Sequence, residues 1–249
     1  MKTQLRIQKF DLSTISPDSS ILIVGRRRTG KSWIIRDLMY ALKDKLPSGV
    51  VFSRTANVNK FFHSFIPELF IHDDVDLKIL EKIMSRQTEK IETMSKHNVG
   101  TKFIILDDVL DDTKWVKDST IKGLMFNGRH IKFFFILAIQ YINSIPQSLM
   151  NNFDYVFLLN ESSLKSKKKL CDSFGGAFEC YSDFDNIFKQ CVKDHGCMVI
   201  NTSGTDISDS IYHFKSKERC NFKVGDPGFW KYSKKQCNKK NKELIVELV

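Results

Sequence analysis

The amino-acid sequence predicts an α/β fold whose central, mostly parallel β-sheet carries helices on both faces. Two observations support this prediction. Short, wholly apolar segments recur along the 249 residues, as is typical of parallel strands that are buried on both faces. Amphipathic stretches separate these segments, and helices that connect parallel strands cover a sheet on both sides.

The predicted elements alternate along the chain. Residues 21–25 (ILIVG) form an apolar strand that leads into a helix with apolar side chains at helical spacing. Leu46-Pro47-Ser48-Gly49 ends this helix, and a second strand begins at residue 50. The remaining predicted elements are a charged helix over 75–98, a strand at 103–106, a helix near 117–127, strands at 131–140 and 155–159, and a short strand at 197–200.

Composition divides the chain into a large domain over 1–215 and a short, basic C-terminal extension over 216–249, where lysines gather between positions 231 and 242. The formal net charge of +10 favours an anionic partner such as nucleic acid. No apolar run approaches the roughly 18 residues of a membrane span, and the N-terminus lacks the apolar stretch of a secretory signal. The six cysteines match no zinc framework, so we expect free thiols.

Residues 25–32, GRRRTGKS, fit the phosphate-binding pattern G-x-x-x-x-G-K-[ST], with a strand before them and a helix after them. Gly25 and Gly30 permit backbone angles that turn successive N–H groups toward phosphate oxygens, and the helix N-terminus adds its partial positive charge. Lys31 is expected to bridge the β- and γ-phosphates of ATP, and the Ser32 hydroxyl to bind Mg²⁺. The sequence therefore predicts a P-loop NTPase with ATP and Mg²⁺ as cofactors.

The neighbouring side chains complete the predicted nucleotide site. Arg28, Thr29 and Trp33 are assigned to the bound nucleotide together with the glycines, the lysine and the serine. Arg26, Arg27 and Arg28 occupy variable positions of the pattern, where the backbone holds the phosphates and the side chains are free to point outward. With the P-loop lysine they make a cluster of cations that repel one another until a triphosphate arrives, so we expect ligand-dependent order in this loop.

Acidic side chains follow the strand at 103–106. Asp107 and Asp108 stand at the carboxyl edge, where ligands bind in open α/β sheets. We assign Asp107 to Mg²⁺ and Asp108 to the attacking water, and we interpret Asp111 and Asp112 as loop residues. Gln140 ends the next strand, where its amide either hydrogen-bonds the γ-phosphate or the water, or is an ordinary strand terminus.

One segment indicates which class of P-loop NTPase this is. It comprises residues 126–159 and reads FNGRHIKFFFILAIQYINSIPQSLMNNFDYVFLL. It resembles a segment of the FtsK–HerA superfamily of DNA-pumping ATPases, in which Gly-Arg precedes a strand ending in Gln and a Pro-containing loop leads to the next strand. Within that superfamily, the sequence of this segment resembles the poxvirus-type virion DNA-packaging ATPases of large nucleocytoplasmic DNA viruses. The resemblance includes VGRRRTGKSWIIRDLMY, residues 55–72 and PGFW at 227–230, and it spans most of residues 20–230.

The resemblance implies a RecA/ASCE-like fold and a ring of five or six subunits that hydrolyses ATP to drive double-stranded DNA, independently of its sequence, into a capsid. Such a motor docks on capsid or inner-membrane vertex components, so we expect it in the host cytoplasm, in the viral factory, or in the virion. Arg129 matches the arginine that reaches the γ-phosphate of a neighbouring subunit as a finger, and Gln140 matches the sensor residue.

Three points stay open at this stage. Asp108 stands where cellular members usually have Glu, which leaves the identity of the general base open. The candidate DNA contacts are the lysines at 165, 167, 168 and 169, or the lysine-rich tail. The alternative functions are a small P-loop kinase, which does not explain Arg129, and a nucleotide-dependent non-motor virion assembly protein, which does not need the complete set of site residues.

Overall fold

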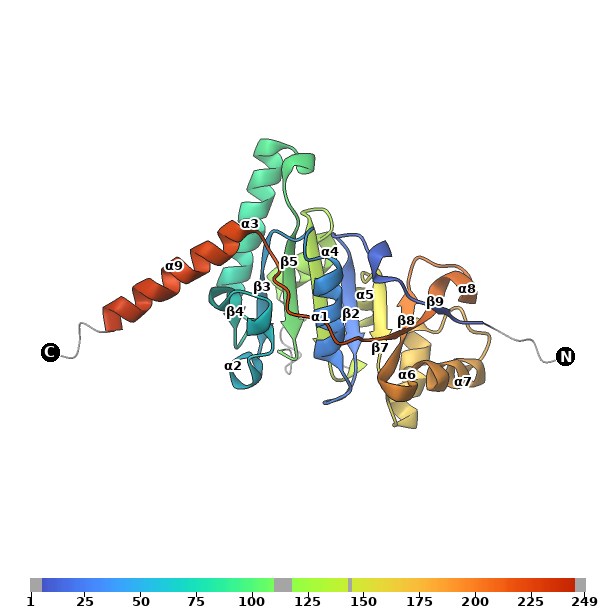
Figure 1. The fold of residues 1–249 in the computed structure, drawn as a ribbon. Helices are drawn as coiled ribbons and strands as arrows, with labels where there is room; N and C mark the ends of the chain where they lie inside the picture. The colour runs from blue at the N-terminus through green and yellow to red at the C-terminus, as the bar shows by residue number, and fades with distance from the viewer. Residues whose placement is uncertain (1–5, 110–117, 143–144, 245–249) are drawn as a thin grey trace.

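The computed structural model describes residues 6–109, 118–142 and 145–244 (Figure 1). These residues form a nine-stranded sheet in the order β1-β9-β8-β7-β2-β6-β5-β3-β4. The strands are β1 Gln8–Lys9, β2 Ser20–Val24, β3 Ser48–Ser53, β4 Ile71–His72, β5 Lys102–Asp107, β6 Phe133–Ile139, β7 Tyr155–Leu158, β8 Gly196–Asn201 and β9 Ile211–Lys215. The helices are α1 Lys31–Ala41, α2 Ala56–Asn59, α3 Leu77–Met94, α4 Ser119–Asn127, α5 Gln147–Met150, α6 Leu164–Phe174, α7 Tyr181–Cys191, α8 Ile207–Ser210 and α9 Pro227–Leu244.

The predicted fold class is confirmed. From β7 to β4 all neighbouring strands are parallel, and β6 lies between β2 and β5. The sheet also has an antiparallel part that the sequence did not predict, because β8 pairs antiparallel with both β7 and β9. Residues 202–210, which connect β8 to β9, are too few for the crossover that a parallel pair requires.

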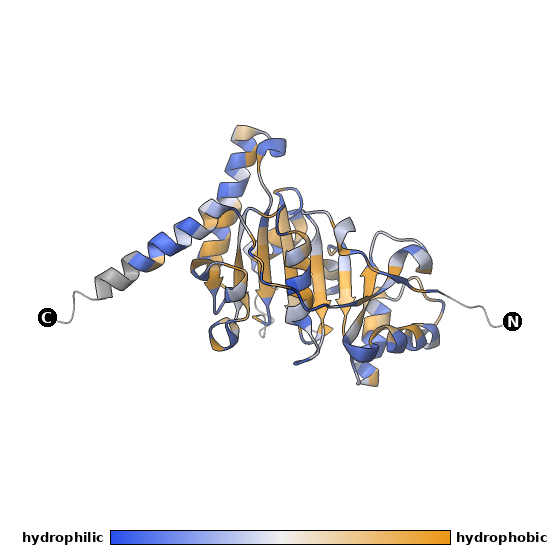
Figure 2. Cartoon of the chain, viewed as in Figure 1, coloured by the Kyte–Doolittle hydropathy of each residue, from blue (hydrophilic) through white to orange (hydrophobic). Residues whose placement is uncertain are grey.

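Two apolar layers cover the sheet, as the uniformly buried strands predict. In β2, Leu22 and Val24 face one core cluster, whereas Ile21 and Ile23 face the other. Helix α1 packs on the second of these faces, and α3, α4, α6 and α7 contribute buried side chains to the first. Figure 2 shows the apolar strands in the middle of the molecule and the polar helix surfaces outside them.

The ends of the predicted elements shift by a few residues. The second strand begins at Ser48 and includes Gly49, where a Cβ atom would lie 2.2 Å from the Phe103 carbonyl oxygen of β5. Gly49 is therefore part of a close strand pairing, and the prediction that it belongs to the end of the preceding helix was wrong, because α1 ends at Ala41. Strands β1, β4 and β9 and helices α2, α5, α6, α7, α8 and α9 were not predicted. The two-residue strands β1 and β4 are too short for a periodic pattern, and α6 and α9 are rich in lysine. Asp111, Asp112 and residue 117 lie outside the described residues.

The predicted C-terminal extension contributes to the core. Phe222, Val224 and Phe229 are buried on the α1 side of the sheet. The Phe229 ring stacks on Phe70, with 4.2 Å between the ring centroids, and α9 then extends away from the sheet (Figure 1). The boundary at 215/216 stays a prediction. Within the described residues, no helix is long and apolar enough to cross a membrane.

Candidate nucleotide-binding site

The P-loop connects β2 to α1 and requires both of its glycines. Gly30 has a φ of 108°, which disfavours other residues, and it is the N-cap of α1. A Cβ atom on Gly25 would lie 2.7 Å from Thr29 Oγ1 and 2.8 Å from Leu159 Cβ. The Gly25 N–H also donates to the Ile139 carbonyl at 3.0 Å, which ties the loop to β6. The sequence pattern thus has a steric basis in this fold.

Lys31 lies within the curve of the loop and is only 8% exposed. Its Nζ donates to the carbonyl oxygens of Gly25 at 2.7 Å and Arg26 at 3.3 Å. Burial lowers the pKa of Lys31, while the nearby carboxylates of Asp108 and Asp107 oppose that shift. A buried ammonium at the N-terminus of a helix is suited to binding an anion.

Asp107 is the last residue of β5 and is 3% exposed. The Ser53 hydroxyl of β3 donates to Asp107 Oδ2 at 3.2 Å. Burial is the main cause that raises the pKa of Asp107 to about 6, against the opposing effects of Lys31 and Ser53. A nearby cation favours the charged form of a carboxylate buried in this way, and a metal-binding role would supply one.

This raised pKa predicts a stability difference that depends on pH. Because the pKa in the folded protein exceeds its ordinary value of 3.8, the protonated carboxyl stabilises the fold below about pH 4, and this stabilisation is lost as pH rises through about 6. Asp107→Asn cannot ionise, so between pH 4 and 7 it should gain on the order of 3 kcal/mol of unfolding free energy relative to wild type. Urea unfolding of both proteins without nucleotide or magnesium measures this; a difference that does not change with pH would contradict it.

The side chains of Asp108 and Gln140 contact each other, although the sequence did not determine the partner of Gln140. Asp108 has a φ of 56°, a value unusual for a non-glycine residue. Its N–H donates to the Ala138 carbonyl at 3.1 Å, which pairs the end of β5 with β6. Gln140 Nε2 donates to Asp108 Oδ2. The amide thus orients the carboxylate, and strained backbone held by such contacts often occurs at functional sites.

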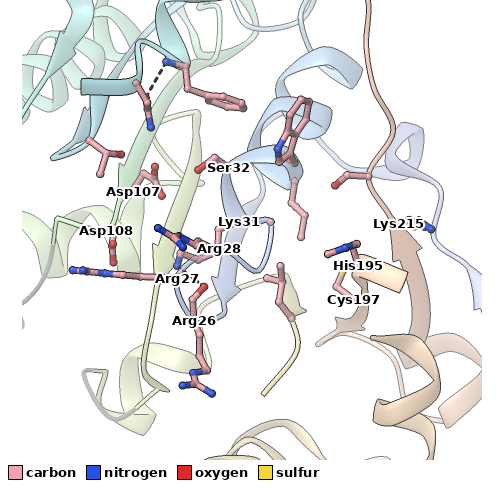
Figure 3. A pocket seen from close by; sticks show the side chains of 18 of the residues that line it. Arg26, Arg27, Arg28, Lys31, Ser32, Asp107, Asp108, His195, Cys197 and Lys215 are labelled. Carbon is pink, nitrogen blue, oxygen red and sulfur yellow. Dashed lines mark hydrogen bonds between the residues drawn. The ribbon is translucent and has the colours of Figure 1, made fainter. Parts of the chain in front are cut away.

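A cavity of about 1220 Å³ is lined by residues 26–28 and 30–32 of the P-loop and by both carboxylates (Figure 3). Of this lining, the sequence predicted Arg28, Gly30, Lys31, Ser32, Trp33, Asp107 and Asp108. The predicted Gly25 and Thr29 do not line this cavity, and Arg26 and Arg27, which do, had no assigned role. The lining residues that the sequence did not suggest are Ile34, Arg54, Thr55, Asn59, Phe61, Leu159, His195, Cys197, Lys215, Ser216, Lys217 and Glu218. Ile34, Thr55, Asn59, Phe61 and Leu159 lie in stretches that carry the family resemblance, but only the fold brings them and the others together in one pocket.

A second cavity, of about 710 Å³, adjoins the first, because Arg26, Arg27 and Asp108 line both. It contains Gln140 and Asp108 together with Arg26 and Arg27. Arg26 Nη1 donates to Ser162 Oγ at 2.6 Å. The three loop arginines are exposed, as expected for side chains that point outward, and Arg28 has a positive φ of 65°.

Arg129 is not brought into the site of its own chain. Its side chain is 59% exposed, and its Nη1 lies 3.1 Å from Asp154 Oδ1. Asp154 Oδ2 accepts the N–H of Ser20, the first residue of β2. The P-loop follows the last residue of β2, whereas Arg129 lies near the first. Arg129 is therefore at the amino-terminal ends of the parallel strands, and its own nucleotide site is at their carboxyl-terminal ends.

The lysines of α6 differ from one another in their surroundings. Lys167 forms an ion pair with Asp185, and both side chains are mostly buried. Lys168 lies 5.9 Å from the ring centroid of Tyr181. Of the predicted DNA contacts on α6, Lys167 is therefore mostly buried in an ion pair within the chain, whereas Lys165, Lys168 and Lys169 are exposed.

The fold and the site define a P-loop ATPase. The DNA-packaging ATPase B204 from Sulfolobus turreted icosahedral virus has a similar structure, with a TM-score of 0.62 at 14% identity over 82% of this chain and 100% of that one. B204 from Sulfolobus turreted icosahedral virus 2 in complex with ATP-gammaS gives a TM-score of 0.59 at 16% identity, over 81% of this chain and 98% of that one. EssC (ATPases 2 and 3) from Geobacillus thermodenitrificans gives 0.53 at 14% identity, over 93% of this chain and 45% of that one.

The chain belongs to the family described as Poxvirus A32 protein, whose model matches residues 8–173. It is 36% identical over 244 residues to an uncharacterized protein of Acanthamoeba polyphaga mimivirus, covering 94% of this chain and 85% of that one. It is 29% identical to an uncharacterized protein of Invertebrate iridescent virus 6, covering 94% of this chain and 95% of that one. The predicted resemblance to the poxvirus-type family is confirmed.

Proposed function

We propose that this protein is an ATP-hydrolysing motor that moves double-stranded viral DNA into the capsid during virion assembly. The main support for the proposal is that Lys31, Asp107 and Asp108 line the same pocket, in a chain that belongs to the Poxvirus A32 protein family. The name of B204 as a genome-packaging NTPase and its complex with ATP-gammaS support ATP as the ligand. The net charge of +10 suits a DNA partner bound through its phosphates.

The site residues have separate roles in ATP hydrolysis. The backbone N–H groups of the P-loop and Lys31 hold the β- and γ-phosphates. The Ser32 hydroxyl and the Asp107 carboxylate are the oxygen ligands that Mg²⁺ prefers, and the bound ion would neutralise charge on the phosphate oxygens. Asp108 accepts a proton from the water that attacks the γ-phosphorus, while the bond to the bridging oxygen of ADP breaks. Gln140 keeps the Asp108 carboxylate in place.

Arg129 acts in this proposal on the site of a neighbouring subunit. Its place at the edge of the sheet opposite its own pocket supports a role between subunits, because it cannot reach its own ATP without rearrangement. A ring of five or six subunits would present Arg129 to each adjacent pocket and couple hydrolysis to assembly. We place this ring in the host cytoplasm, at the viral factory or on the virion, docked on capsid or inner-membrane vertex components.

Mixing inactive variants tests the role of Arg129 between subunits. Lys31→Ala subunits keep the arginine but lose the ATP site, whereas Arg129→Ala subunits keep the ATP site. Each variant alone should be inactive, and mixing them should restore about a quarter of wild-type ATP hydrolysis, because only some interfaces combine an intact site with an arginine. The rate is measured as phosphate release with and without double-stranded DNA, which should increase it.

The control for this experiment is Arg129→Ala mixed with the double variant Lys31→Ala/Arg129→Ala, which has no functional arginine to contribute and should stay inactive. Failure of the first mixture to recover activity, when sizing shows that the two variants co-assemble, would rule out the trans role. Wild-type hydrolysis that is independent of DNA and of protein concentration would overturn the motor function itself.

A further inference from the structure

The nucleotide cavity has two chemically different ends. Asp107 and Asp108 lie at one end, the P-loop lies in the middle, and His195, Cys197 and Lys215 lie at the other end (Figure 3). A triphosphate on the P-loop with its γ-phosphate toward the carboxylates therefore has its ribose and base directed toward the opposite end. The wall of that end includes residues 215–218, which connect β9 to the C-terminal segment.

We infer that residues 215–218 bind the nucleoside part of ATP, and that the ion pair between Asp37 and Arg219 positions them. This inference rests on the proposed ATPase function. It assigns the start of the predicted C-terminal extension to the nucleotide site. It also assigns Asp37 and Arg219, which do not line the cavity, as positioning residues.

Asp37 fastens this segment to α1 through both of its carboxylate oxygens. Asp37 is 0% exposed. Its Oδ1 accepts Arg219 Nε at 2.7 Å, and its Oδ2 accepts the backbone N–H of Lys217 at 3.0 Å. A buried carboxylate is costly unless it is paired and hydrogen-bonded, so the segment is held where these two donors meet Asp37.

Further contacts hold Arg219 on the same helix. The Arg219 guanidinium lies 4.6 Å from the ring centroid of Tyr40. The Arg219 carbonyl accepts Arg36 Nη2 at 3.3 Å. Asp37, Arg36 and Tyr40 all belong to α1, the helix that begins with the phosphate-binding Lys31. One rigid element thus sets the spacing between the phosphates and the wall formed by residues 215–218.

The chemistry of this end suits a nucleoside. Ser216, Lys217 and Glu218 offer a hydroxyl, an ammonium and a carboxylate, which can hydrogen-bond the hydroxyl groups of ribose and the polar edge of a base.

A comparison of ATP with tripolyphosphate tests the inference, because tripolyphosphate has the phosphates without the nucleoside. The double variant Lys217→Ala/Glu218→Ala removes two exposed side chains of the wall, leaves the net charge unchanged and keeps the backbone N–H of residue 217. It should weaken ATP binding about tenfold and change tripolyphosphate binding less than about twofold. Calorimetric titration in magnesium gives both dissociation constants.

Arg219→Gln tests the positioning role, with Lys223→Ala as its matched control. Both changes remove one positive charge from the same segment, but Lys223 lies over the Trp230 ring and does not line the cavity. Arg219→Gln should raise the ATP dissociation constant and KM about tenfold, with little change in kcat at saturating ATP and in tripolyphosphate binding. Lys223→Ala should change none of these.

The outcomes separate this inference from the proposed function. Wild-type protein that binds both ligands, with the wall variants losing neither or losing both equally, overturns the inference and leaves the ATPase function standing. Wild-type protein that binds neither ligand overturns the ATPase function and the inference with it. If Arg219→Gln does not fold, the double variant of the exposed side chains still decides the result.

Discussion

Lys31→Ala is expected to lower the rate of ATP hydrolysis on the order of 1,000-fold at saturating ATP. The expected loss is large because Lys31 is a buried cation inside the P-loop curve, where its Nζ is positioned by the Gly25 and Arg26 carbonyl oxygens. Solvent cannot readily substitute for a charge in this place. Steady-state phosphate release measures the effect.

Lys45→Ala is the control for this prediction, since Lys45 is an exposed lysine just beyond the C-terminus of α1. It should leave the hydrolysis rate unchanged, and thermal unfolding should show that both variants are folded. A Lys31→Ala protein that keeps more than a tenth of wild-type activity would mean that hydrolysis takes place elsewhere in the chain.

Asp108→Asn is expected to lower kcat about 100- to 10,000-fold, the usual contribution of a general base, and to leave ATP affinity almost unchanged. Asparagine has the same shape and can still accept the hydrogen bond from Gln140 Nε2, but it cannot take a proton from water. Single-turnover hydrolysis and a separate ATP titration distinguish the lost chemistry from lost binding.

Two further variants sharpen this prediction. Asp108→Glu restores a carboxylate one methylene longer, and it should recover part of the activity lost in Asp108→Asn. Asp44→Asn is the control, because Asp44 is an exposed carboxylate paired with Lys43. Nearly full activity of Asp108→Asn would assign the proton transfer to another group and leave Asp108 a positioning role.

Features that depend on neighbouring residues in the sequence were predictable. The P-loop, its flanking strand and helix, and the acids after β5 are encoded in short continuous patterns. Each was placed within a few residues because burial on both faces requires an unbroken apolar run. The two-residue strands β1 and β4 and the lysine-rich helices gave no such pattern, since tertiary contacts stabilise them.

The sequence predicted only part of the contact between Gln140 and Asp108. Both residues were candidates because they end strands of the sheet. The sequence suggested that Gln140 takes the next position along the carboxyl edge of the sheet, and the pairing of β5 with β6 confirms it; the hydrogen bond between the two side chains was not predicted. For Arg129 the fold has the opposite effect, because it places this candidate away from the nucleotide site of its own chain. Arg129 lies at the amino-terminal ends of the parallel strands, where it pairs with Asp154.

By itself, the sequence determined the class of this protein and its phosphate-binding chemistry, since a P-loop is a local structure whose glycines, lysine and serine act within eight consecutive residues. Only the tertiary structure decided how the rest of the pocket is closed. Asp37 and Arg219 are 182 residues apart, yet their ion pair fastens the C-terminal segment beside the nucleotide cavity. A buried carboxylate takes whichever donor the fold brings to it, and no local pattern encodes that choice.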